Sequence, residues 1–114
     1  METFEVGDVV VVKFPFSDLS NFKLRPALIL FNENYDYVLC QITSQSYNDS
    51  DSIKLLDVNF ISGSLNRTSY IRPFKLFTAN NEIITRKLAS LNKKTLESVY
   101  QTIQEKIELN LKNF

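Results

Sequence analysis

Arg25-Pro26-Ala27-Leu28-Ile29-Leu30 is the segment from which the other strands of this chain can be placed. The residue before a proline is biased toward an extended backbone. A proline is tolerated at the start of a strand, where its missing N–H costs little. We therefore expect a strand from Ala27 to Phe31, with Arg25 at the junction between this strand and the preceding loop.

Two further strands are predicted on either side of this segment. Four consecutive valines begin at Val9, and a continuous run of β-branched residues predicts a strand from Val9 to Phe14 that is buried on both faces or nearly so. After the segment, a turn at Asn32–Asn34 leads into a predicted strand from Tyr35 to Thr43. The three strands could form a meander.

The middle of the chain predicts shorter strands. Ile53 to Val58 is a short strand candidate, and the surroundings of Gly63 predict a turn. Ser69 to Leu76 predicts a strand that Pro73 interrupts, which indicates a sheet edge or a bulge. Ile83 to Leu91 predicts another extended segment.

The last segment differs, because its apolar residues recur at helical spacing. They are Leu96, Val99, Tyr100, Ile103, Ile107 and Leu111. Asn92 or Thr95 could cap the start of this helix. Many short strands followed by one amphipathic helix predict a mainly β fold: a partly open small barrel of antiparallel strands on which the helix packs. We expect residues 1–114 to form a single domain.

Charged residues balance over the whole chain but are unevenly distributed. The chain has 13 Lys and Arg and 13 Asp and Glu, a formal net charge of zero, which argues mildly against a nucleic-acid-binding protein. Between Ser64 and Lys94, however, there are seven basic residues and one acidic residue. Between Leu30 and Phe60 there are five acidic residues and one basic residue. An anionic ligand could use the first stretch and a basic partner the second.

The chain contains no histidine and a single cysteine, Cys40. The absence of histidine excludes His-based hydrolases, His–Cys pairs and most zinc sites, and we expect neither a metal site nor a cofactor. Cys40 lies in an apolar stretch, which favours a small buried hydrophobic residue over a reactive thiol. With no possible intrachain disulfide, no signal peptide and no run long enough to span a bilayer, we expect a cytoplasmic protein.

Chemistry that uses a nucleophile already present on the substrate is compatible with this composition. RNA carries such a nucleophile in its 2′-hydroxyl, and a protein that cleaves RNA through it must align the phosphate and stabilise negative charge. Arg25 suits bidentate phosphate binding, while Thr43 and Ser44, at the end of a predicted strand, can donate to phosphate oxygens. Arg72 lies two residues from an aromatic residue on either side, where bases could stack.

The same residues also have purely structural interpretations. Arg25 could be a surface residue at the start of a strand, and Thr43 and Ser44 could simply end one. Arg72 could pair with a glutamate elsewhere in the chain. Taken alone, these residues indicate a small β-rich domain that could bind an anion.

In several segments the chain resembles the MazF/PemK family of type II toxin–antitoxin toxins. The Arg-Pro motif quoted above is the most specific of these segments. The others, in order, are Gly7-Asp8-Val9-Val10, Gln41-Ile42-Thr43-Ser44-Gln45, Ser69-Tyr70-Ile71-Arg72 and Arg86-Lys87-Leu88. Together they extend the resemblance over roughly Val6 to Ile103.

This resemblance implies an SH3-like barrel that works as a homodimer. It also implies a metal-independent, cofactor-free endoribonuclease that cuts single-stranded RNA through the substrate's 2′-hydroxyl and arrests growth. The family's catalytic arginine falls on Arg25 and its catalytic threonine on Thr43. Ser44 and Arg72 match positions that contact RNA in some members, and Lys23 is a further RNA-binding candidate. The implied partner is a small antitoxin protein, and toxin and antitoxin together are expected to bind DNA.

The resemblance leaves the cleavage sequence open. The loop Ser17–Leu24, which precedes the Arg-Pro motif, lacks the glycine that is usual in the family, and this loop contributes to the choice of RNA. Two other functions also stay open. One is a non-enzymatic toxin that inhibits a protein target such as gyrase, and the other is a module that only binds the antitoxin.

Overall fold

A computed structural model describes residues 3–15, 21–46 and 50–114. Residues 17–20 of the predicted loop Ser17–Leu24 lie outside the described residues, as do residues 47–49. Within the described residues, no helix is both long enough and apolar enough to cross a membrane.

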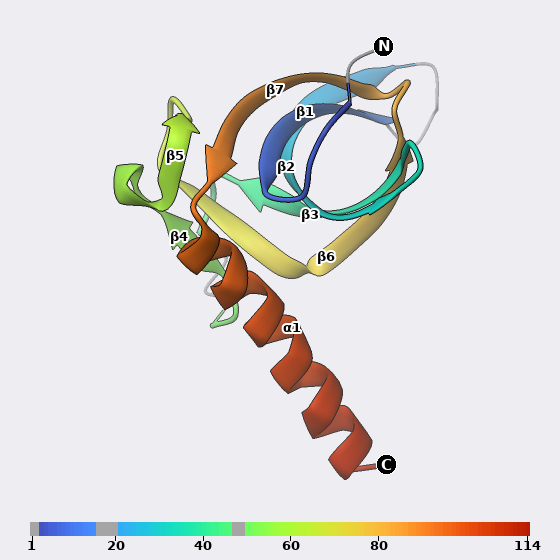
Figure 1. The fold of residues 1–114 in the computed structure, drawn as a ribbon, viewed down its shortest axis with the longest axis vertical. Coiled ribbons are helices and arrows are strands. Elements are labelled where there is room, and N and C mark those ends of the chain that lie inside the picture. The colour runs from blue at the N-terminus through green and yellow to red at the C-terminus, as the bar shows by residue number, and fades with distance from the viewer. Residues whose placement is uncertain (1–2, 16–20, 47–49) are drawn as a thin grey trace.

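The described chain forms one antiparallel sheet of seven strands that curls into a partly open barrel, with a single α-helix at its C-terminal end (Figure 1). The strands are β1 (Asp8–Pro15), β2 (Phe22–Glu33), β3 (Asp36–Thr43), β4 (Ile53–Leu55), β5 (Phe60–Gly63), β6 (Ser69–Asn80) and β7 (Ile84–Leu91). A short 3₁₀ helix η1 (Asp57–Asn59) precedes β5, and the helix is α1 (Lys93–Lys112). The strand order is β4-β6-β3-β2-β1-β7-β5, so the predicted mainly β fold and the β1–β2–β3 meander are confirmed.

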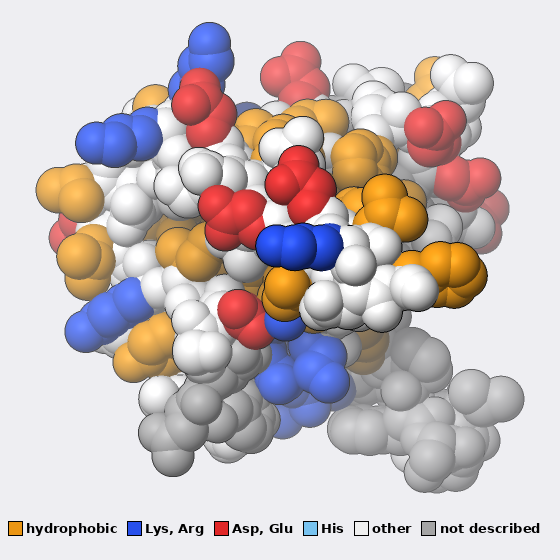
Figure 2. All heavy atoms as spheres, turned by 90° about the horizontal axis from the view of Figure 1, so that it is seen from below, with side chains coloured by type: hydrophobic (Ala, Val, Ile, Leu, Met, Phe, Trp, Pro, Cys, Tyr) orange, Lys and Arg blue, Asp and Glu red, His pale blue; other side chains and the backbone are white. Residues whose placement is uncertain are grey.

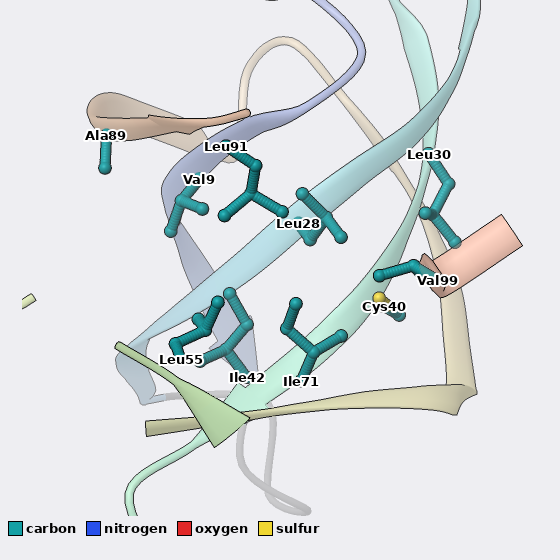
Figure 3. Close-up of a cluster of buried hydrophobic side chains, with 10 residues drawn as sticks. All are labelled: Val9, Leu28, Leu30, Cys40, Ile42, Leu55, Ile71, Ala89, Leu91 and Val99. Carbon is teal, nitrogen blue, oxygen red and sulfur yellow. The ribbon is translucent and has the colours of Figure 1, made fainter. Parts of the chain in front are cut away.

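Buried side chains form two clusters on opposite faces of the sheet. Successive residues of a strand point to opposite faces, so the valine run contributes to both: Val9 to one cluster, Val10 and Val12 to the other. All three are 0% exposed, which confirms the prediction of a strand buried on both faces. The cluster that contains Val9 also contains Val99 of α1, and Figure 3 shows its members converging from the strands and the helix.

Pro26 and Pro73, which lie in the interior of strands, affect the sheet in different ways. The predicted start of a strand at Ala27 is wrong, because β2 begins at Phe22 and Pro26 lies within it, opposite Val11 of β1. Pairing of β2 with β3 begins only at Ala27, so at the proline β2 has one neighbouring strand and not two. The bulge predicted at Pro73 is confirmed, because the β3–β6 ladder jumps from Cys40↔Leu76 to Gln41↔Arg72.

The region around Gly63 contains more regular structure than its sequence predicts. The turn expected there is preceded by a short strand, β5, which pairs with β7. The strand expected over Ile53 to Val58 ends at Leu55, where η1 follows. Gly63 has φ +71°, and a Cβ atom at this position would collide with the backbone of Leu88 and Ala89 in β7. Glycine is therefore required where β5 ends.

The apolar residues of α1 pack on the barrel as far as Ile103. Beyond Ile103, Lys106 still reaches the barrel, with its Nζ atom 5.0 Å from the centre of the Phe74 ring in β6. Asn92 caps the helix, since its side-chain oxygen accepts a hydrogen bond of 2.8 Å from the backbone N–H of Thr95. Val99 is fully buried, but Ile107 and Leu111 are 60% and 73% exposed. The helix extends away from the barrel (Figure 1). Figure 2, which views the molecule from the side of the helix C-terminus, shows hydrophobic side chains between charged ones. The expectation that the whole apolar stripe packs on the sheet is wrong for these last turns.

Candidate functional site

A cleft opens where β2 and β3 separate. The last pair of residues that joins these strands is Ala27↔Gln41, and continuing this register by two residues would place Arg25 opposite Thr43. Instead, the start of β2 pairs only with β1, while the end of β3 pairs with β6. A cleft with a volume of about 460 Å³ lies between the two diverging strands. This volume falls in the range of pockets that hold small ligands.

Three chain segments line this cleft. They are residues 23–26 at the start of β2, residues 42–45 at the end of β3, and residues 65–67 with Ser69 at the start of β6. Strand ends hold side chains on a rigid frame while leaving them accessible, which suits a binding site.

The cleft is basic. Among the described residues, its lining contains Lys23, Arg25 and Arg67 and no aspartate or glutamate. All three basic side chains are exposed, and within the described part of the chain no carboxylate forms an ion pair with any of them. Guanidinium groups bind phosphate and carboxylate bidentately, so the cleft offers an anion several donors without an internal competitor.

Two hydroxyl groups stand beside these cations. The Oγ1 atom of Thr43 accepts a hydrogen bond of 3.2 Å from the backbone N–H of Gln45. This bond uses the threonine oxygen as acceptor, so the O–H can donate to an oxygen of a bound anion. Thr43 is half-buried, whereas Ser44 is exposed. The cleft therefore offers neutral donors as well as charged ones.

The structure brings four of the five predicted site residues together. Lys23, Arg25, Thr43 and Ser44 all line the cleft. Arg72 does not line it. It is half-buried and pairs with Gln41, two residues before Thr43 along β3. Strand alternation puts Arg72 on the same face of the sheet as Thr43, next to the cleft but outside its lining.

Sequence reasoning did not single out the third wall of the cleft. Arg67 belongs to the basic stretch between Ser64 and Lys94, but nothing in the sequence distinguishes it from the other basic residues there. The Oγ atom of Ser69 donates a hydrogen bond of 3.0 Å to the carbonyl oxygen of Arg67. This bond and the glycine at position 63 hold the connection between β5 and β6 at the cleft.

Cys40 takes no part in this site. Its side chain is fully buried, as predicted. Burial raises the pKa of the Cys40 thiol to about 12, so the thiolate that a nucleophile requires does not form near neutral pH. Burial also raises the pKa of nearby Tyr100, whose hydroxyl donates a hydrogen bond of 2.6 Å to the carbonyl oxygen of Leu30. Both residues belong to the core.

The described residues contain no group of three or more His, Cys, Asp or Glu side chains that could hold a metal ion.

Comparison with protein families places this small barrel with its basic cleft among the toxins of type II toxin–antitoxin systems. Residues 5–107 match the family described as PemK-like, MazF-like toxin of type II toxin-antitoxin system, and the chain belongs to this family. No curated protein matches the sequence.

Solved structures show the same fold at low sequence identity. The Mycobacterium tuberculosis toxin MazF-mt6 is 18% identical, with a TM-score of 0.68 over 89% of this chain and 96% of that one. MazE-MazF from Deinococcus radiodurans gives 16% identity and a TM-score of 0.74 over 95% and 98%. An endoribonuclease in complex with its cognate antitoxin from a mycobacterial species gives 15% identity and a TM-score of 0.72 over 95% and 96%. The fold is preserved although most residues differ.

Proposed function

We propose that the chain is the toxin of a type II toxin–antitoxin system and acts as a metal-independent endoribonuclease on single-stranded RNA. The observation that carries this proposal is the cleft itself. It gathers three cations and the hydroxyl groups of Thr43, Ser44 and Ser69, its lining among the described residues contains no carboxylate, and it lies where two strands diverge in a toxin of this family. Such a lining fits a polyanion better than an apolar or basic ligand.

The proposed reaction uses the 2′-hydroxyl of the RNA as nucleophile. The 2′-oxygen forms a bond to phosphorus and loses its proton, while the bond from phosphorus to the 5′-oxygen breaks and that oxygen gains a proton. The products are a 2′,3′-cyclic phosphate and a 5′-hydroxyl end, so no water molecule is consumed in this step. The protein must hold the phosphate in line and stabilise the charge that develops on its oxygens.

Arg25 and Thr43 are proposed to carry this chemistry. A guanidinium carries five N–H donors and no acceptor, so Arg25 acts as the clamp on the scissile phosphate. Thr43 donates its O–H to a phosphate oxygen, because its own oxygen is already occupied by the Gln45 N–H. Ser44 and Lys23 are proposed to bind neighbouring parts of the RNA, and Arg72, which lies beside the cleft, is proposed to contact RNA that continues beyond it.

An antitoxin and a second copy of the chain are the proposed protein partners. Solved structures with this fold include MazE-MazF and an endoribonuclease bound to its cognate antitoxin. A cleft without carboxylates also fits an acidic antitoxin segment that competes with RNA for the same cations. We further propose that the chain works as a homodimer in the cytoplasm and that its complex with the antitoxin binds DNA.

The test is cleavage of a defined long single-stranded RNA by the purified protein, with and without EDTA. We expect the same cut sites in both conditions and a cyclic phosphate at each new 3′ end. A substrate with a single 2′-deoxynucleotide before the cut should be resistant. Cleavage of that substrate would refute the 2′-hydroxyl mechanism. Growth arrest without any RNA cleavage would refute the nuclease and favour an inhibitor of a protein target.

A further inference from the structure

The third wall of the cleft is not explained by cleavage of a single phosphodiester. Arg25 already supplies a bidentate donor for one phosphate, yet Arg67 contributes a second guanidinium to the same lining. One phosphodiester carries one negative charge, whereas a strand of RNA presents another phosphate at each neighbouring nucleotide. No carboxylate of the described residues pairs with this second arginine, and a second phosphate explains it best.

Arg67 is held by the fold and is not on a free loop tip. The Oγ atom of Ser69 fixes the Arg67 carbonyl at 3.0 Å, and Ser69 is itself 5% exposed at the start of β6. On the other side, Gly63 ends β5 with a backbone conformation that only glycine adopts without collision with β7. The segment between these two anchors is short, so the place of Arg67 at the cleft is determined by both strands.

Arg67 lies between the cleft and a second hollow. Besides the cleft, it lines a neighbouring hollow that contains Asp57, but it forms no ion pair with Asp57 or any other carboxylate of the described residues. Its long side chain can therefore turn toward RNA without first breaking a salt bridge. The carboxylate of Asp57 disfavours any anion in that second hollow, which leaves the cleft as the place for a phosphate.

We propose that Arg67 binds the phosphate next to the scissile one, so that the cleft holds two successive phosphates of the RNA, one on Arg25 and one on Arg67. This inference rests on the proposed ribonuclease function. It assigns Arg67 a role in binding and register, because its phosphate does not react. It also predicts that the two arginines differ in kinetic effect: Arg25 acts on the chemical step and Arg67 on substrate binding.

The first test compares Arg67→Gln with Arg86→Gln, which removes an exposed arginine of β7 outside the cleft lining. On an RNA with one mapped cut site, Arg67→Gln should raise KM roughly tenfold with kcat within about twofold of the parent. The slope of log affinity against log salt should fall by about 0.7, as for one lost contact to single-stranded RNA. Arg86→Gln should leave KM nearly unchanged. Equal effects of both variants would mean diffuse charge and would overturn the proposal.

The second test removes the phosphate charge. A neutral methylphosphonate is placed at each linkage beside the cut site in turn. At one position the methylphosphonate should weaken RNA binding by the parent protein roughly tenfold. It should leave RNA binding by Arg67→Gln unchanged, because both changes remove the same contact. Additive losses at every position would overturn the assignment. If Arg67→Gln is not folded by circular dichroism, Arg67→Lys replaces it, with an intermediate KM expected.

The two proposals fail in different ways. If the parent protein neither cleaves nor binds the RNA, the ribonuclease function fails and the Arg67 assignment fails with it. If the parent cleaves normally and Arg67→Gln matches it in KM and salt slope, only the Arg67 assignment fails.

Discussion

The two sides of the cleft are built in different ways. One side consists of strand ends, with Arg25 near the start of β2 and Thr43 at the end of β3. The other side is the connection between β5 and β6, which carries Arg67. The first is held by ladders to β1 and β6, and the second by one hydrogen bond from Ser69 and one glycine. Under the proposed function, the strand side performs the chemistry and the connecting side holds the substrate.

The largest effect is expected on the strand side, at Arg25. Replacing it with alanine removes the proposed clamp on the scissile phosphate, and loss of such a donor typically costs about 10²–10³ in rate. Because Arg25 is exposed, the variant should keep the melting temperature of the parent protein. Single-turnover cleavage with saturating RNA measures the rate. A folded Arg25→Ala protein that cuts at the parental rate would remove the catalytic assignment from this side.

Thr43 should have the next largest effect. Thr43→Val keeps the shape of the side chain and removes its hydroxyl, which should slow cleavage by roughly 10–100-fold, the value of one hydrogen bond to a charged group. The variant also loses the acceptor for the backbone N–H of Gln45, so a change in the following loop has to be separated from a change in chemistry. Thr43→Ser, which retains the hydroxyl, is the control. We expect it to stay within a few-fold of the parent rate, and equal losses in both variants would point to a structural role.

On the connecting side, the expected effect of Gly63→Ala is on stability. The residue has positive φ, and the added methyl group would meet the carbonyl oxygen of Leu88 and the Cα atom of Ala89. We expect the free energy of unfolding to fall by about 1–3 kcal/mol. Gly7→Ala is a matched control, because Gly7 also has positive φ but its Cβ would only reach the Leu96 side chain at 3.5 Å. Denaturant unfolding of both variants should show the larger loss at Gly63, and equal losses would mean that the collision with β7 is unimportant.

The same comparison shows what the sequence can and cannot predict. Apolar patterns follow burial, as in the run from Val9 to Phe14 and in the helical spacing from Leu96. The strands and the start of the helix are therefore predictable. The junctions at Arg25 and Thr43 follow from these strands. Together with the family resemblance they gave five predicted site residues, of which four line the cleft.

The errors come from contacts between distant segments. β2 begins at Phe22 because β1 pairs with its first residues, and β5 exists because β7 pairs with it. Arg67 reaches the cleft only through the path of the chain between β5 and β6, which no local pattern encodes. The apolar residues at the end of α1 match the helical period but are exposed, since the helix extends past the barrel (Figure 1). Periodicity predicts which face of an element is apolar, not what covers it.

The smallest effect is expected at Lys23, which lines the cleft on the strand side but is exposed. Exposed charge pairs contribute little, so Lys23→Ala should raise KM about two- to fivefold at low salt without a change in kcat. The difference should shrink as salt increases, because screening weakens contacts between exposed charges. Lys112→Ala, at the end of α1 far from the barrel (Figure 1), controls for the loss of one positive charge and should leave KM unchanged. A lower kcat in Lys23→Ala would place Lys23 with Arg25 and Thr43 in the chemical step. The strand side would then act on the chemical step at all three positions, and substrate binding would depend on the connecting side.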